Sequence, residues 1–303
     1  MSKRIEIASV SKRFGRVEAL RDVSLAVEAG EVVALLGHNG AGKTTLFRIM
    51  LGFIRANGGT LSICGEIAGS AAARRAISYL PESVAFPKML TGREVVELYA
   101  TLKGAARGDA GKALEQVGLA EAADRRCGTY SKGMRQRLGL AQAIVGQPKV
   151  LLLDEPTSGL DPVSRGEFYE LIAGLARSGT AVLLSSHGLS ELEARAERVA
   201  ILRKGRLVAD GPLAALQKSA GLPTRIRVRS TAGGAADIHQ RFGGRRINGA
   251  SVEIACAGEE KMPVLAALHA APEPVADIEV MPPTLDEVYR YYSLGSNVEE
   301  DRS

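Results

Sequence analysis

The sequence predicts an α/β fold built on a sheet of parallel strands, and three apolar runs are the main reason. Residues 31–36, 149–154 and 180–186 are each of strand length, and each leads directly into polar residues. Such runs are typical of strands buried in a parallel sheet, whose carboxyl ends face a ligand. Helical patterns elsewhere in the chain complete the α/β prediction.

A glycine-rich loop follows the first of these strands and precedes residues 46–51, which have the character of the first turns of a helix. Strand, GxxxxGK[ST] loop and helix, in that order, make up a phosphate-binding P-loop. The alternative is a glycine-rich turn before an ordinary helix, but a chance match to the four fixed positions has odds on the order of one per cent. The predicted nucleotide site comprises Gly37, His38, Asn39, Gly40, Ala41, Gly42, Lys43, Thr44 and Thr45.

The residue types of this loop suit a phosphate. Its glycines let successive backbone N–H groups converge on an anion, and the start of a helix adds partial positive charge. Lys43 is then placed to reach the β- and γ-phosphates of a nucleotide, and the Thr44 hydroxyl to bind Mg²⁺.

Residues that bind Mg²⁺, activate water and contact the γ-phosphate are predicted at the ends of the other two apolar strands. Asp154 and Glu155 close the second, where the aspartate of a P-loop protein holds the Mg²⁺ shell and the next carboxylate activates the attacking water. A solvated acidic turn is the alternative, but it leaves unexplained why the pair ends the most apolar strand. His187 follows the third strand, within reach of a γ-phosphate; a lone histidine is more often structural.

Bulk properties exclude several classes of protein. The chain has 303 residues, 46% hydrophobic and 24% charged, which suits one large and one small soluble domain, or two medium ones. It lacks an apolar run of roughly 18 residues and a signal peptide, so we expect a cytoplasmic protein. Three scattered cysteines argue against disulfides and zinc, and a net charge of +5 with few aromatic residues does not suggest a nucleic-acid partner.

The segments on either side of the P-loop have different characters. Residues 4–8 and 23–27 are predicted strands, with Phe14 in the polar turn between them, where it either stacks on a base or packs in the core. Thr91 and Glu94 have capping-box spacing, and helical patterns continue over residues 112–117 and 135–144. Residues 84–147 therefore form a predicted all-helical insert.

These motifs, in this order, resemble the nucleotide-binding subunit of ATP-binding-cassette (ABC) transporters over residues 3–218. The signature segment is residues 130–137, in which Ser131 and Gly133 match the positions that close on the γ-phosphate bound by a second copy. Phe14 matches the adenine-stacking position, Asp161 ends the D-loop and His187 matches the switch histidine. The resemblance implies an ATPase that uses ATP and Mg²⁺, with Lys43, Glu155 and His187 as catalytic residues.

The same resemblance implies an architecture and a mechanism. Domain 1–218 is expected to contain a mixed sheet core, an antiparallel β subdomain and a helical subdomain at about 84–147. Two copies are expected to form a head-to-tail dimer that ATP closes and hydrolysis reopens.

The chain departs from the family pattern in two places. Lys132 and Met134 stand where Gly and Gln are usual, although Ser131 and Gly133 between and beside them are kept. Glu82 stands where a glutamine normally touches Mg²⁺ and meets the membrane partner. A carboxylate still ligates Mg²⁺ and adds a negative charge near Glu155. Our hypothesis is that Glu82 keeps basal hydrolysis low until the partner binds.

After a linker at residues 221–223, residues 224–303 are predicted to form a small α+β accessory domain for dimer contacts or regulation. Strands are expected at residues 224–230, 251–256 and 278–280, and helices at 263–269 and 283–292. Arg225, Arg227 and Arg229 alternate along the first of these strands. We interpret them as a solvated strand face rather than an anion site.

Within the family, residues 129–142, 220–227 and 277–292 resemble the ATPase subunits of transporters that help to mature nitrous oxide reductase, a copper enzyme. That resemblance implies a polytopic membrane permease, a periplasmic partner that handles copper or sulfur, and a position on the cytoplasmic face of the inner membrane. The chain itself carries no CxxC, methionine cluster or histidine pair, so the cargo rests on the resemblance alone.

Three alternatives remain open from the sequence. The first is an ABC exporter of a lipid, drug or other small molecule, which differs only in cargo. The second is a soluble ABC protein without a membrane partner, although such proteins usually carry two cassettes or a coiled-coil arm. The third, a nucleotide sensor that does not hydrolyse ATP, conflicts with the presence of Glu155 and His187.

Overall fold

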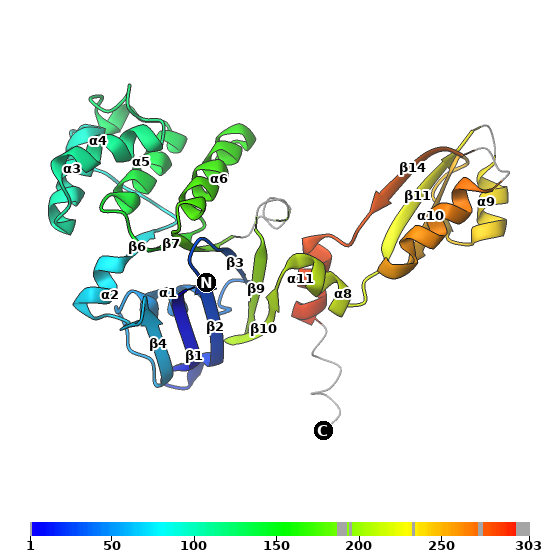
Figure 1. The fold of residues 1–303 in the computed structure, drawn as a ribbon, viewed down its shortest axis with the longest axis horizontal. Helices are drawn as coiled ribbons and strands as arrows, with labels where there is room; N and C mark the ends of the chain where they lie inside the picture. The colour runs from blue at the N-terminus through cyan, green and yellow to red at the C-terminus, as the bar shows by residue number, and fades with distance from the viewer. Residues whose placement is uncertain (1, 187–192, 194–195, 232–233, 272–274, 295–303) are drawn as a thin grey trace. The chain divides into compact units, whose positions relative to one another are not determined.

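The computed structural model describes residues 2–186, 193, 196–231, 234–271 and 275–294. The chain divides into two compact units, Met1–Gly211 and Pro212–Ser303 (Figure 1). The sequence placed this boundary slightly later, between residues 218 and 224. It falls earlier because α8 (Leu213–Ser219) contacts α11 (Leu285–Leu294) and so belongs with the second unit.

The centre of the first unit is a mixed sheet, which confirms the predicted α/β fold. Among the described residues its strands follow the spatial order β10 (Arg206–Gly211), β9 (Arg198–Arg203), β3 (Val32–Leu36), β8 (Ala181–Ser185), β7 (Val150–Asp154) and β6 (Ile77–Leu80). All neighbours pair in parallel except β10, which is antiparallel to β9. The carboxyl ends of β3, β6, β7 and β8 therefore meet at one edge.

A second, antiparallel sheet has the order β2 (Val17–Glu28), β1 (Lys3–Phe14), β4 (Gly58–Ile63) and β5 (Glu66–Ile67). The first two strands are longer than predicted, and Phe14 is the last residue of β1 instead of part of a polar turn. The β1–β2 pair has several register shifts, and Ser9 and Asp22 have φ 52. At these positions extra residues interrupt the alternation of buried and exposed side chains. Bulges of this kind let a strand continue past an irregular pattern.

Helix α1 (Lys43–Met50) packs in a core that residues of both sheets share. Its side chains of Leu46, Phe47 and Met50 are almost completely buried. The P-loop at its start is therefore held on a rigid element, and α2 (Ala71–Ala76) and α6 (Pro162–Arg177) complete the helices packed near the sheets.

The predicted helical insert contains α3 (Gly92–Lys103), α4 (Arg107–Gln116), the short helix η1 (Cys127–Thr129) and α5 (Lys132–Ile144), and α3, α4 and α5 contact one another (Figure 1). The capping box at the start of α3 is formed: Glu94 N donates to Thr91 Oγ1 at 3.2 Å, and Thr91 N donates to Glu94 Oε2 at 2.7 Å. These two bonds satisfy N–H groups that helix geometry leaves unpaired.

In the described residues of the second unit, a sheet has the order β12 (Arg245–Arg246), β13 (Ser251–Cys256), β11 (Thr224–Ser230) and β14 (Val275–Met281). Helices α9 (Ala235–Phe242) and α10 (Lys261–His269) share its core, and the short helix η2 (Gly258–Glu260) precedes α10. Side chains of α9 and α10 pack with Ile226, Val228 and Val252 from this sheet.

The arginines of β11 are paired with acids of helix α11 and of the neighbouring strand β14. Arg225 bonds Glu287, Arg227 lies 3.2 Å from Glu279, and Arg229 lies 3.6 Å from Asp277. These ion pairs offset the charge of the three arginines, whose side chains are partly exposed. In the part of the chain that the structure describes, no helix is both long and apolar enough to cross a bilayer.

Candidate nucleotide-binding site

A cavity of about 470 Å³ lies at the carboxyl edge of the central sheet. It brings together the P-loop, Glu82 from the segment after β6, and Asp154 and Glu155 after β7, which are distant in the sequence. Its other walls come from the β1–β2 hairpin and from Lys204. The lining residues are Val17, Glu18, Ala19, Arg21, His38, Asn39, Gly40, Ala41, Gly42, Lys43, Thr44, Thr45, Glu82, Asp154, Glu155 and Lys204.

The P-loop needs glycine where the structure places it. Gly42 has φ 115, and a Cβ there would lie 2.7 Å from the Ala19 carbonyl oxygen. A Cβ on Gly37 would lie 2.6 Å from the carbonyl oxygen of Leu202. The described residues provide no side-chain cap for α1, so its first-turn N–H groups remain available to an anion at the positive end of the helix.

Lys43 is buried, with 7% of its surface exposed, and its Nζ donates a hydrogen bond to the carbonyl oxygen of Gly37. Burial lowers the pKa of Lys43, while the nearby carboxylates of Glu155 and Asp154 oppose that shift. A desolvated cation beside the P-loop interacts strongly with a phosphate, because little water remains to screen the charge.

The two acids are held by neighbouring strands. Ser185, paired with Asp154 across β7 and β8, donates from its Oγ to Asp154 Oδ1 at 2.6 Å. Tyr79 of β6 donates from its hydroxyl to Asp154 Oδ2 at 3.1 Å. The sequence did not identify Tyr79 or Ser185 as site residues, because their roles depend on the order of the strands. The one available signal was that both lie near the ends of predicted parallel strands.

Thr44, Glu82 and Asp154, the predicted Mg²⁺ ligands, all line this cavity. Among the described residues, no group of three or more His, Cys, Asp or Glu side chains is arranged to hold a metal alone. This donor set fits Mg²⁺, which keeps several waters and is usually bound by one or two protein oxygens together with substrate phosphates. The site therefore suits a metal that arrives with the nucleotide.

Phe14 lies at the tip of the β1–β2 hairpin, paired with Val17, and is 48% exposed. Val17 lines the cavity but Phe14 does not. Lys12 Nζ lies 4.9 Å from the centre of the Phe14 ring, a distance typical of a cation–π contact. His187, the predicted switch residue, lies outside the described residues.

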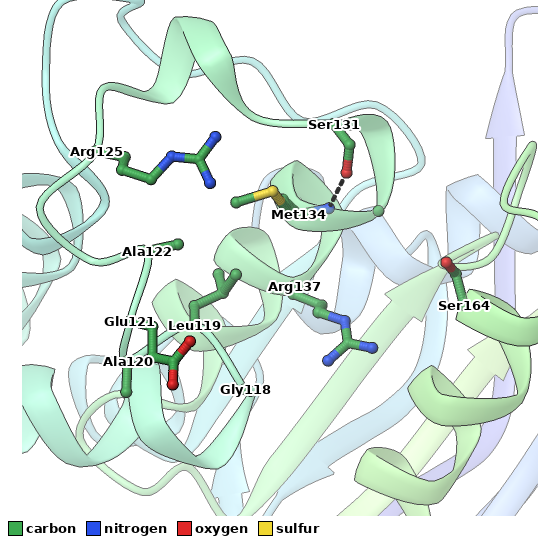
Figure 2. A pocket seen from close by; sticks show the side chains of 11 residues that line it. Gly118, Leu119, Ala120, Glu121, Ala122, Arg125, Ser131, Met134, Arg137 and Ser164 are labelled. Atoms are coloured by element: carbon green, nitrogen blue, oxygen red, sulfur yellow. Dashed lines mark hydrogen bonds between the residues drawn. The ribbon is translucent and has the colours of Figure 1, made fainter.

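Ser131 and Gly133 line a different cavity of about 630 Å³, together with Met134, Arg125 and Arg137 (Figure 2). Ser131 caps α5: its Oγ accepts a hydrogen bond from Met134 N at 3.1 Å, drawn as a dashed line in Figure 2. None of the residues around this cavity lines the P-loop cavity. Within one chain, the structure does not bring the two sets together.

The residues next to the signature connect it to the D-loop. Asp161 caps α6 by accepting from Val163 N at 3.1 Å and Ser164 N at 3.0 Å, and Ser164 itself lines the signature cavity. Hydrogen bonds from Ser164 hold the pKa of Asp161 below its ordinary value. Lys132, one of the two unusual signature residues, places its Nζ so close to Gly159 that a Cβ added at Gly159 would collide with it.

Comparison with known proteins places these features in a family. A family model described as "ABC transporter" matches residues 20–158. The chain is 40% identical over 205 residues to an uncharacterized ABC transporter ATP-binding protein of Synechocystis, covering 66% of this chain and 58% of that protein. It is 41% identical over 225 residues to the doxorubicin resistance ATP-binding protein DrrA of Mycobacterium tuberculosis, covering 72% of this chain and 68% of DrrA.

Two further similarities extend this result. The human phospholipid-transporting ATPase ABCA7 is 35% identical over 308 residues, covering 95% of this chain and 14% of that protein. A solved ATP-binding subunit of an ABC transporter has a TM-score of 0.66 at 30% identity and covers 72% of this chain and 93% of that subunit. The present chain therefore belongs to the ATP-binding proteins of ABC transporters, and like other ABC ATPase domains it binds ATP with Mg²⁺.

Proposed function

We propose that this chain is the ATP-hydrolysing subunit of a membrane ABC transporter, in which two copies close on two ATP molecules. The carrying observation is that one chain holds two separate half-sites. The P-loop cavity contains the phosphate-binding loop and the acids, and the other cavity contains Ser131 and Gly133, with no lining residue in common. A head-to-tail pair of copies joins the first half-site of each chain to the second half-site of the other.

In this proposal each residue has a defined task. The P-loop amides and Lys43 bind the phosphates, and Phe14 and Val17 lie on the side where the base is expected. Thr44, Glu82 and Asp154 hold Mg²⁺, which when bound stabilises the charge that develops on the transferred phosphoryl group. Glu155 orients and deprotonates the attacking water, His187 bonds the γ-phosphate, and Asp161 supports the D-loop.

The partners follow from the family. ABC ATPase subunits dimerise and work with membrane permeases, so we assign a second copy and a polytopic permease as partners, with the chain on the cytoplasmic face of the inner membrane. Co-purification with a polytopic membrane protein tests this assignment. Recovery of the chain without any membrane partner, in active form, would favour the soluble ABC protein instead.

A more specific proposal concerns the cargo that the transporter carries. The segments 129–142, 220–227 and 277–292 support a permease that serves copper-site maturation of nitrous oxide reductase, with a periplasmic accessory partner. A second candidate, an exporter of a drug or lipid, is supported by the similarity to DrrA and by the alignment with ABCA7 over 95% of this chain.

Deleting the gene in its host separates these two candidates. If the maturation proposal is correct, nitrous oxide reductase from the deletion strain lacks its normal copper content, and resistance to drugs is unchanged. Normal copper content together with drug sensitivity or altered membrane lipids would favour the exporter.

A further inference from the structure

Both oxygens of the Asp154 carboxylate accept hydrogen bonds from hydroxyl groups on adjacent strands. Ser185 Oγ donates to Oδ1 at 2.6 Å, and the Tyr79 hydroxyl donates to Oδ2 at 3.1 Å. Hydrogen bonds to an ionised carboxylate are stronger than those between neutral groups. The two bonds together fix the rotation of the Asp154 side chain.

Ser185 also contacts the second acid. It is completely buried, and its Oγ accepts a hydrogen bond from Glu155 N at 3.1 Å. Glu155 N lies 3.2 Å from the Ser185 carbonyl oxygen as well. A serine hydroxyl has one donor and two acceptor positions, so one group can serve Asp154 and Glu155 together.

The backbone of Glu155 explains why this contact matters. Glu155 has φ 48, a left-handed conformation that is unfavourable for a residue with a side chain. The bonds from Glu155 N to Ser185 hold the chain in this conformation directly after β7. The direction in which the Glu155 carboxylate leaves the strand therefore depends on Ser185.

Tyr79 is itself well supported. Its ring packs edge-on against Phe47 of α1, with ring centres 6.3 Å apart, so the helix that carries the P-loop also positions the phenol. A phenol is protonated at neutral pH, so the Tyr79 hydroxyl donates its hydrogen to Asp154. Both donors to Asp154 are neutral, and they orient the carboxylate without cancelling the charge that attracts Mg²⁺.

We propose that Tyr79 and Ser185 are positioning residues of the ATPase site: together they aim the Asp154 carboxylate at the Mg²⁺ shell, and Ser185 also sets the direction of Glu155. This inference rests on the proposed function, because it assigns the acids the tasks given above. The proposal assigns different consequences to the loss of each of the two hydroxyl groups. Loss of either hydroxyl weakens metal binding, whereas only loss of the Ser185 hydroxyl disturbs the acid that activates water.

The test uses the full-length Tyr79→Phe, Ser185→Ala and Ser185→Thr variants. Binding of Mn²⁺ with a non-hydrolysable ATP analogue, followed by electron paramagnetic resonance, reports metal affinity without turnover. We expect an approximately tenfold or greater loss of metal affinity in Tyr79→Phe and Ser185→Ala. In ATPase assays, Tyr79→Phe should regain near-normal kcat at saturating Mg²⁺, whereas Ser185→Ala should keep a lowered kcat and Ser185→Thr should recover part of it.

Ser78→Ala is the matched control, since Ser78 is a buried serine of β6 whose hydroxyl bonds Lys103 instead of an acid. It should leave metal affinity unchanged. Normal Mn²⁺ affinity in both Tyr79→Phe and Ser185→Ala would overturn the proposal. Because the metal measurement requires no hydrolysis, it still decides the matter if the wild-type chain proves not to be an ATPase.

Discussion

Lys43 shows how burial decides the behaviour of a single residue at this site. Replacing it with alanine removes a desolvated cation next to the P-loop, together with its bond to the Gly37 carbonyl. We expect ATP affinity in Lys43→Ala to fall by about tenfold to a hundredfold, since hydrogen bonds to charged groups contribute about 1.5–3 kcal/mol. Equilibrium binding of a fluorescent ATP analogue measures this, and an affinity equal to that of the wild type would exclude the phosphate-binding role.

Glu155→Gln tests the assignment of the general base. The amide has nearly the same shape but cannot accept the proton of the attacking water, so kcat should fall by about 10²- to 10⁴-fold while ATP affinity is kept. The variant should also accumulate as an ATP-bound dimer in size-exclusion chromatography. Turnover at the wild-type rate would show that another group takes the proton.

Glu82→Gln tests the hypothesis that this carboxylate restrains basal activity. Glu82 and Glu155 line the same cavity, and removing one negative charge there should raise the ATPase rate measured without the permease by about twofold to tenfold. Glu97→Gln serves as the control, because Glu97 of α3 does not line the cavity. Equal rates for wild type and Glu82→Gln would remove the hypothesis.

At the scale of residues, the sequence predicted the parts of the site that are linked by short motifs. The P-loop, Asp154 and Glu155 are close in space because each follows a strand of one sheet. Tyr79 and Ser185 were not predicted, since which strands are neighbours is decided by packing and not by local pattern. The position of Phe14 at a strand end was missed for a similar reason, because bulges are not visible in alternation counts.

At the scale of elements, one lysine joins three secondary-structure elements. Lys103, the last residue of α3, donates from Nζ to Ser78 of β6 at 2.9 Å and to three carbonyl oxygens at the end of α5, the nearest being that of Ala143 at 2.8 Å. The other end of α5 begins at Ser131. Lys103 therefore links the helix that presents the signature serine to the strand that carries Tyr79.

Lys103→Met should lower the free energy of unfolding by about 1–3 kcal/mol, because carbonyl groups at the end of α5 lose their partner. Burial of the ammonium lowers the pKa of Lys103 to about 8 from an ordinary 10.5. Between these values the unfolded state binds more protons, so the wild-type stability should rise with pH relative to Lys103→Met, from pH 8 to about 10. The ammonium is enclosed by its hydrogen-bond partners, but residue 103 as a whole is exposed, so solvent screens part of its charge. The rise should therefore be about 1 kcal/mol or less.

Chemical denaturation of both proteins at pH 7, 8, 9 and 10 measures this difference. Lys112→Met on α4 is the matched control: its side chain is 77% exposed and lies 3.5 Å from Asp109, so its removal should have little effect at any of these pH values. A difference between wild type and Lys103→Met that stays constant with pH would show that the ammonium is not desolvated.

The sequence predicted elements well where caps and apolar runs mark them. The capping box of α3 and strands β3, β7, β8, β11 and β13 lie close to their expected positions. Helix α6, 16 residues long, was not predicted although Asp161 caps it, and the short helices α2, α8 and α9 were also not predicted. The three short helices have six to eight residues, and at that length tertiary contacts outweigh intrinsic helix preference.

At the scale of the whole molecule, the two cavities that we propose as halves of one catalytic site share no lining residue within one copy. The residues of the P-loop predicted a phosphate site by themselves, whereas the role expected of Ser131 and Gly133 is implied by the family resemblance alone, since a helix cap has the same sequence pattern. The tasks of the second unit, with its paired arginines and acids, are not encoded in any motif of the sequence.

Mixing two complementary variants measures most directly whether the two half-sites act across copies. Lys43→Ala disables the P-loop, and Gly133→Asp disables the signature; the added Cβ of the latter meets only ordinary contacts, the nearest being Ser164 Oγ at 3.5 Å. Each variant alone should be nearly inactive, and an equimolar mixture should recover roughly a quarter of wild-type ATPase activity, because half of the dimers contain one intact site. A mixture that stays as inactive as its components would contradict the shared site.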